Sequence, residues 1–267
     1  MFVYGYSNSG RLGLNSGSYN DYSSPTQVGT SFDFTGLWQV TYAGSQGVFQ
    51  KNTNDLFVTG YNANGALGQN DTTKYSSPIQ IPGTWTQVTA GGNMMMATKG
   101  GDEYVWGQNN YGQLGMNSVG SPTHAGLSSP TQLPGTWSSS AGKTCLGNYT
   151  SYAIRTNGTL WSWGRDFIGN LGHNQGGTYP SYPASKSSPT QIGTETTWTH
   201  GSLEGSWNGG GFCKKTDGTL WCWGWNGSGQ LGLNSRVSYS SPVQVAAYSD
   251  GWLKYGRMGG AANAIIK

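Results

Sequence analysis

Residues 3–15 read Val-Tyr-Gly-Tyr-Ser-Asn-Ser-Gly-Arg-Leu-Gly-Leu-Asn, and variants of this stretch return four more times along the 267-residue chain. Each copy places a Gly shortly before a Gly-x-Leu-Gly-x-Asn run. The opening glycines are Gly5, Gly60, Gly107, Gly164 and Gly224. Self-similarity at a near-constant period is the signature of a repeat architecture, so these copies decide the fold.

Two further markers follow each copy at a variable distance. The first is a Ser-Pro pair, after which an apolar residue or Thr precedes a Gln. The second is a Trp, at Trp38, Trp85, Trp137, Trp198 and Trp252. Successive opening glycines are 55, 47, 57 and 60 residues apart, a spacing that matches four short strands and their turns.

The two ends of the chain complete one further period. After Gly224, 43 residues remain, and the first five residues bring this remainder to 48. Residues 263–267 then correspond to the strand before a hairpin, and residues 1–5 to the strand after it. Pairing of these half-repeats would satisfy the strand edges that a linear stack leaves open. The sequence therefore predicts an all-β, five-bladed β-propeller of four-stranded blades, closed by pairing of the N- and C-terminal strands.

We predict a single propeller domain over residues 1–267, in which residues 243–267 and 1–5 complete the closing blade. The repeats begin near Val3, Val58, Val105, Ser162 and Cys222. The composition agrees with a folded all-β domain. The 45 Gly residues oppose helix propagation. The 12 Trp, 16 Tyr and 7 Phe residues are too many for a disordered chain that buries no side chains.

Charge is sparse. The 14 basic and 11 acidic residues give a net charge of +3, so neither nucleic acid nor an anionic membrane is expected as a partner. The N-terminus shows no leader pattern, and no run of 18 apolar residues occurs. We expect synthesis in the cytoplasm without a signal peptide, and no membrane insertion.

Together, the Trp-Gly, Gly-x-Leu-Gly-x-Asn and Ser-Ser-Pro markers resemble the regulator of chromosome condensation repeat, and the resemblance covers essentially the whole chain. It implies a β-propeller. Copy number differs, since the best known members of that family resemble seven-bladed rings and five copies are counted here. Kelch and WD repeats fit less well, because their own markers do not recur.

We interpret the repeated positions as structural. An indole at the end of an inner strand can fill the space between blades, and the Gly after it can turn the chain at positive φ. These blade markers are Gly5, Gly60, Trp106, Gly107, Trp163, Gly164, Trp223 and Gly224.

One cysteine pair lies near a hairpin signal. If Asp217-Gly218 forms a two-residue turn, Cys213 faces Cys222 within reach of a disulfide. The corresponding pair one repeat earlier is Ala153 and Ser162, so the position can equally require only small side chains.

The sequence contains no motif that supports a catalytic activity. His124, His173 and His200 fall at different positions of different repeats and lack metal-ligand spacing. A nucleophile elbow, a phosphate-binding loop and a zinc-binding helix motif are also missing from the sequence. We therefore predict no enzyme activity, no catalytic residues, no metal and no cofactor.

The variable connections between the Asn and Ser-Pro markers suggest a recognition surface. They emerge at the same place in each blade and combine Tyr with Ser, Gly, Asn and Thr, a composition typical of adaptable binding loops. The alternative is that these rings only brace the blades. The candidate partner-binding residues are Tyr19, Tyr22, Tyr75, His124, Tyr179, Tyr182, Trp207 and Tyr239.

These features predict a non-enzymatic binding or assembly module. The interpretation we favour from the sequence is a protein of the virion exterior, such as a phage head decoration or tail protein, because virion proteins need no export signal. Its partners would be other virion or assembly subunits, or a surface glycan. Otherwise the protein would be cytoplasmic. Two alternatives remain: an intracellular protein-interaction regulator similar to the namesake of the family, an exchange factor for a small GTPase, and a glycan-binding propeller using Trp and Tyr platforms.

Overall fold

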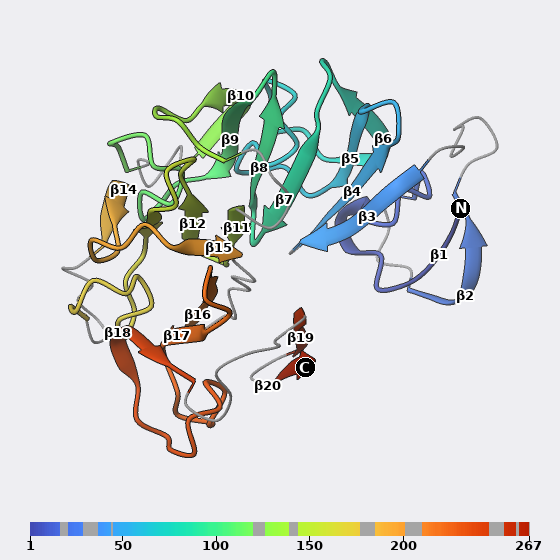
Figure 1. The fold of residues 1–267 in the computed structure, drawn as a ribbon. Coiled ribbons are helices and arrows are strands. Elements are labelled where there is room, and N and C mark those ends of the chain that lie inside the picture. Colours follow the sequence, from blue (N-terminus) through green and yellow to red (C-terminus); the bar gives the residue numbers. More distant parts are fainter. Residues whose placement is uncertain are drawn as a thin grey trace. The chain divides into compact units, whose positions relative to one another are not determined.

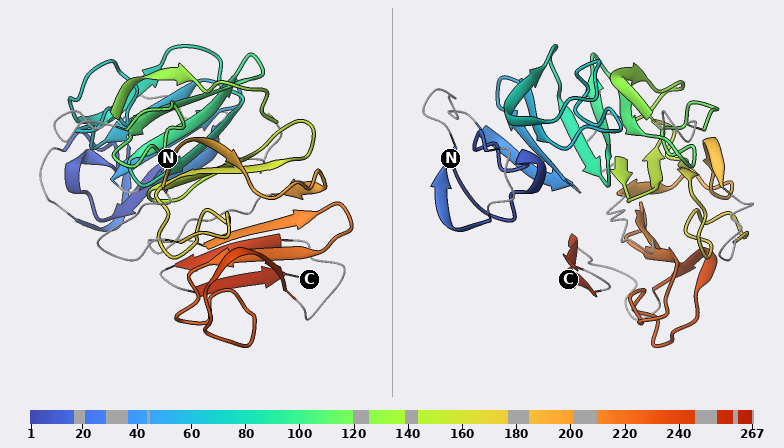
Figure 2. Two further views of the ribbon diagram at one scale, coloured as in Figure 1. Left: turned by 90° about the vertical axis from the view of Figure 1, so that its left-hand side faces the viewer. Right: turned by 180° about the vertical axis from the view of Figure 1, so that it is seen from behind.

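The computed structural model describes residues 1–16, 21–28, 37–43, 45–119, 126–138, 144–176, 185–200, 210–245, 254–259 and 262–266. These residues form β-strands joined by turns, with a single short 3-10 turn, η1 (Asn8–Gly10) (Figures 1 and 2). The predicted all-β class is confirmed.

Four sheets have four antiparallel strands each, and in every sheet the strands lie in chain order (Figure 1). The first contains β3 (Leu37–Ala43), β4 (Gln46–Lys51), β5 (Leu56–Gly60) and β6 (Tyr75–Ile81). The second contains β7 (Gln87–Gly91), β8 (Met94–Lys99), β9 (Asp102–Gln108) and β10 (Gly126–Gln132). The third contains β11 (Thr144–Leu146), β12 (Thr150–Ile154), β13 (Leu160–Gly164) and β14 (Lys186–Gln191). The fourth contains β15 (Trp198–His200), β16 (Gly210–Lys215), β17 (Leu220–Gly224) and β18 (Tyr239–Gln244).

Each end of the chain forms a two-stranded sheet. β1 (Phe2–Gly5) pairs with β2 (Tyr22–Gln27), and β19 (Lys254–Gly259) pairs with β20 (Ala262–Ile266). In chain order these pairs correspond to the outer and inner halves of a complete blade. Pairing of β20 with β1, and with it the number of five blades and the single domain, stays a prediction.

The chain divides into two compact units. One consists of Met1–Gln108 and Ser121–Leu133, and the other of Asn109–Gly120 and Pro134–Lys267.

Within each unit, the indoles that the sequence marks donate to backbone carbonyls of the preceding repeat. Trp106, Trp163 and Trp223 are fully buried. Their indole N–H groups donate to Ala66 O, Gln113 O and Asn170 O at 3.0, 2.9 and 3.0 Å. Each acceptor is the variable residue of the Gly-x-Leu-Gly run one repeat earlier, so two markers form one junction.

A second junction joins the Asn marker to the Ser-Ser-Pro marker of the next repeat. Asn70 adopts φ 61° and donates its backbone N–H to Ser128 O at 2.7 Å, while its Oδ1 accepts from Ser129 Oγ at 3.0 Å. Asn117 and Asn174 repeat both contacts with Ser187–Ser188 and Ser240–Ser241. The proline of this marker does not begin a strand. It lies inside the outermost strand, next to a register shift that accommodates the lost N–H.

The predicted opposition of Cys213 and Cys222 is wrong. The hairpin has a three-residue loop, in which Gly218 at φ 84° donates to Lys215 O at 3.0 Å, rather than a two-residue turn. This shifts the register by one residue, so Cys213 pairs with Trp221, and Cys222 with Phe212. Because a one-residue shift moves a side chain to the other face, the two sulfurs pack in separate hydrophobic clusters and no disulfide joins them.

Candidate binding surface

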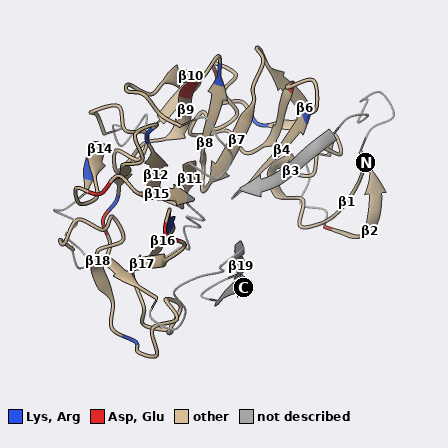
Figure 3. Cartoon of the chain, in the orientation of Figure 1, with Lys and Arg blue, Asp and Glu red and all other residues tan. Residues whose placement is uncertain are grey.

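Charged side chains are few along the described chain (Figure 3). The described residues contain no group of three or more His, Cys, Asp or Glu side chains that could hold a metal ion. They also contain no helix with the length and apolarity needed to cross a membrane. We therefore searched for a surface whose shape and side chains would bind a partner.

Most of the predicted partner-binding residues lie outside the described residues. These are Tyr19, His124, Tyr179, Tyr182 and Trp207. For them the sequence-based prediction stays a prediction.

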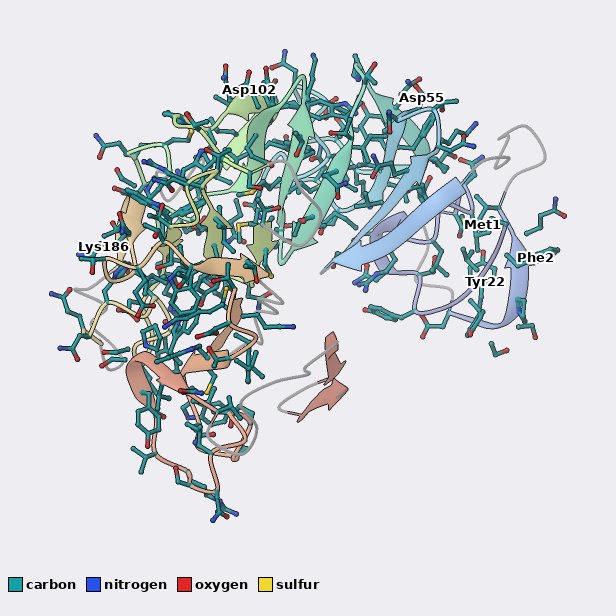
Figure 4. The ribbon with its side chains drawn as sticks, viewed as in Figure 1. Met1, Phe2, Tyr22, Asp55, Asp102 and Lys186 are labelled. Atoms are coloured by element: carbon teal, nitrogen blue, oxygen red, sulfur yellow. The ribbon has the colours of Figure 1, made fainter. Side chains whose placement is uncertain are left out.

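The other three, Tyr22, Tyr75 and Tyr239, occupy one equivalent position. Each begins the outermost strand of its sheet and pairs with an opening glycine, Gly5, Gly60 or Gly224. Each ring is partly buried and packs against the hydrophobic cluster of its sheet. Tyr22 is labelled in Figure 4 beside Met1, which belongs to the same cluster. At these three positions the ring braces the blade and keeps one part of its surface exposed.

A different row of residues follows the opening glycines directly. Its members are Tyr6, Tyr61, Gln108, Arg165 and Trp225, and we call them the post-glycine row. All are partly or well exposed, and Tyr6 has 51% of its surface exposed. Four of the five are Tyr, Arg or Trp, the types that dominate the binding energy of protein interfaces. The sequence analysis missed this row, although its fixed spacing from the glycines could have revealed it.

The glycine before each member fixes the direction of the chain. Gly164 has φ 101°, and a Cβ there would lie 2.3 Å from Tyr149 O. The next residue, Arg165, donates its backbone N–H to the same carbonyl at 2.8 Å. Tyr61 and Gln108 make the same backbone contact with Ser45 O and Asn93 O. A backbone hydrogen bond therefore fixes these three members of the row at the end of a strand.

Arg165 is the centre of an aromatic cluster, which we call the Arg165 cluster. Its guanidinium carbon lies 5.1 Å from the ring centre of Tyr111, 5.4 Å from that of Tyr149 and 5.3 Å from that of Phe167. The two Tyr rings meet edge to face, with centroids 5.2 Å apart. All four side chains are partly exposed. Such contacts hold an Arg and its neighbouring rings in place before a partner arrives.

The opposite ends of the strands carry a second repeated feature. A basic residue at the end of the second strand, or directly after it, lies over aromatic rings. Lys99 Nζ lies 5.6 Å from the ring centre of Trp85. Arg155 Cζ lies 3.7 Å from the ring centre of Trp161, and Lys215 Nζ lies 3.6 Å from that of Trp221. We call these the cation–aromatic stations. Each contributes about 0.5–2 kcal/mol to the blade.

Three histidines were considered from the sequence. Of these, His173 is the one whose side chain lies among the described residues. Its Nε2 lies 3.0 Å from Ser162 Oγ. Burial, and after it the charge of Lys186, lowers the pKa of His173 below its usual value, so the ring is neutral at pH 7. It lines a pocket described below.

Comparison with protein families agrees with these repeats. A model described as "Regulator of chromosome condensation (RCC1) repeat" matches residues 54–98 and 217–258. Both begin near a third strand and run into the next sheet, so the family repeat bridges two sheets of this chain. Comparison with curated protein sequences finds no match.

Solved structures with this fold include RCC1-type proteins. Human WBSCR16 superposes with a TM-score of 0.72 at 21% identity, covering 95% of this chain and 64% of that one. Yeast RCC1 (Prp20), solved with Kap60 bound to it, has a TM-score of 0.73 at 18% identity, covering 95% and 59%. Prp20p of Saccharomyces cerevisiae, studied for its binding to Gsp1p and histones, has a TM-score of 0.54 at 13% identity, covering 95% and 75%.

The chain therefore has an RCC1-like β-propeller fold, as its repeats predict. It spans less than two thirds of the length of the first two structures. At these identities the likeness concerns the fold alone.

Proposed function

We propose that this chain is a non-enzymatic protein-binding propeller whose post-glycine row contacts the partner. The Arg165 cluster is the observation that carries the proposal. It combines one Arg with three aromatic rings that are held by backbone contacts and partly exposed. Interfaces concentrate their binding energy in such residues.

The position of the cluster fits the recognition loops predicted from the sequence. Gly164, at the end of β13, pairs with Lys186, where the long connection after His173 rejoins the sheet. Lys186 is labelled in Figure 4. Loop and cluster therefore share one end of the strands, so a partner held by the loop would also reach Arg165.

The fold supports a protein partner over the virion exterior that the sequence suggested. The RCC1-type structures named above concern complexes with, or binding to, other proteins: Kap60, Gsp1p and histones. They are from human and yeast and give the virion setting no support. We accordingly favour the regulator alternative and its cytoplasmic setting, and both the virion and the glycan readings stay predictions.

The test compares partner capture by three purified variants. We expect R165A and W225A to weaken binding to a captured partner at least tenfold, because each removes a ring or charge from the row. D102A is the matched control, since exposed Asp102 lies at the other end of its strand, paired with Lys99. Equal capture by all three variants would refute the surface proposed here.

An exchange-factor role is a second candidate, favoured by the structural likeness to Prp20p and its binding to Gsp1p. It predicts that the protein accelerates the release of bound nucleotide from a small GTPase. A release assay with a fluorescent guanine nucleotide measures this directly. Binding of a GTPase without faster release would leave a binding module and exclude exchange.

A further inference from the structure

The turn after the outermost strand differs between repeats. It reads Ile81-Pro-Gly-Thr-Trp85 and Leu133-Pro-Gly-Thr-Trp137, but Ile192-Gly-Thr-Glu-Thr-Thr-Trp198. The third version is two residues longer. In the short turns the indole N–H donates to a carbonyl of the turn, from Trp85 to Ile81 O at 3.3 Å and from Trp137 to Pro134 O at 3.1 Å.

The longer turn leaves the indole N–H of Trp198 without a partner. Trp198 is only 3% exposed, and its Nε1 has no hydrogen bond among the described residues. A buried donor without an acceptor costs about 1–3 kcal/mol, so this N–H is expected to have an acceptor when the site is in use.

A pocket of about 460 Å³ opens at this place. Trp198 and Trp221 form one wall, with centroids 6.3 Å apart and an interplanar angle of 79°. His173, Gln191 and Glu195 contribute polar side chains. This volume lies within the range of natural small-molecule sites.

The pocket carries no net charge. Glu195 Oε2 lies 2.6 Å from Lys215 Nζ, so the acid of the longer turn neutralises the adjacent cation. His173 is neutral, as argued above. Phosphate, carboxylate and ammonium ligands would therefore find no opposite charge in excess.

A neutral ligand rich in hydroxyl groups fits these features. A hydroxyl oxygen can accept from the Trp198 N–H, and a hydroxyl hydrogen can be donated to the carboxylate of Glu195, whose side chain is 49% exposed. The partly exposed indole of Trp221 can pack against the carbon–hydrogen face of a sugar ring.

We propose that the pocket between β14 and β17 is a binding site for a neutral sugar, with the Trp198 N–H as the donor that orients it. The site lies toward the hairpin ends of the strands, where Gln191 pairs with Trp161. The Arg165 cluster lies at the opposite strand ends. The proposal is therefore independent of the protein-binding surface.

Isothermal titration with maltotriose, cellotriose, lactose and triacetylchitotriose tests the proposal. We expect the wild-type protein to bind at least one of them, and W198F to bind it about tenfold more weakly, because the ring remains but the N–H is lost. W137F is the matched control, since the Trp137 N–H is already bonded within its short turn. It should bind like the wild type.

A second variant deletes Thr194 and Glu195, which restores the four-residue spacing seen from Ile81 to Trp85. We expect it to fold, with the turn closed over the pocket, and to lose sugar binding. Circular dichroism and thermal unfolding check the fold of both variants. Absence of sugar binding by the wild type, equal binding by W198F, or binding of neutral peptides instead would each overturn the proposal.

Discussion

Repeat three (residues 105–161) and repeat four (residues 162–221) share the contacts that join them to their neighbours but differ in one amide-to-carboxyl exchange and in the length of one turn. Trp106 and Trp163 both donate to a carbonyl of the preceding repeat. Repeat three then has Asn109 and a short turn before Trp137, where repeat four has Asp166 and the longer turn before Trp198. The shared residues hold the blades together, so the departures are where a particular function can be looked for.

The largest predicted effect concerns a shared residue. W163A should lower the free energy of unfolding by about 3–5 kcal/mol, because a fully buried indole and its N–H bond to Gln113 O are both lost. Urea denaturation measures the change, and W106A should behave alike. W161A, at a partly exposed station, is the milder control. A loss below about 1 kcal/mol for W163A would show that the indole junction does not hold the sheets.

A smaller effect concerns the Asn109 and Asp166 difference. Asn109 uses both ends of its amide, since Oδ1 accepts from Leu114 N at 2.9 Å and Nδ2 donates to Ser118 O at 3.0 Å. Asp166 is fully buried, and its Oδ2 has no hydrogen bond among the described residues. Burial raises the pKa of Asp166 to about 6.

D166N should therefore stabilise the protein by about 2 kcal/mol at pH 7.5, and N109D should destabilise it by a similar amount. Because the folded-state pKa of Asp166 is raised, the native protein retains a proton that the unfolded chain loses. The advantage of D166N over the wild type should grow as the pH rises from 4 to 6 and then stay constant. Unfolding titrations across this range provide the measurement. A pH-independent difference would contradict a buried carboxyl as the cause.

The smallest effect tests closure of the ring. Asn174 and Ser241 form the last described Asn–Ser junction, with Ser241 Oγ 3.2 Å from Asn174 Oδ1. Asn15 donates its backbone N–H to Ser76 O at 2.8 Å, which leaves Asn234, at φ 52°, and the Ser-Ser-Pro marker that contains Ser24. If β20 pairs with β1, these two residues meet.

A double-mutant cycle with N234A and S24A should then show a coupling of about 0.5–1 kcal/mol in unfolding free energy, equal to that of N174A with S241A. The second cycle calibrates the first within the same protein. Additive effects for Asn234 and Ser24, with coupling for Asn174 and Ser241, would mean that the chain does not close as five blades.

The sequence was sufficient to predict the all-β class and the four-stranded sheets, because repeated Gly and Trp positions reflect constraints that every blade shares. Gly164, for example, shows the positive φ and the close backbone approach expected of its marker. The hairpin register was wrong because Asp217-Gly218 is compatible with loops of two or three residues. Here Asp217 Oδ1 accepts from Thr219 N, which favours the longer loop.

The binding residues were harder to predict. The Arg165 cluster combines Tyr111, Tyr149 and Phe167 from three separate segments, and only folding brings them together. The indole N–H of Trp198 lacks an acceptor because its turn has two extra residues. The effect of this insertion is recognised only by comparing this turn with the shorter turns of the other repeats. Spacing identifies what blades have in common, whereas these features arise from local differences in length.

The Asn–Ser junction also bears on how such a chain can change over evolutionary time. Each junction is made by one Asn from one repeat and a Ser-Ser pair from the next. An unequal crossover that copies one whole repeat would therefore supply a donor and an acceptor that already match. Relatives with larger rings can arise from smaller ones through such genetic events, because the added repeat already carries the residues of the Asn–Ser junction.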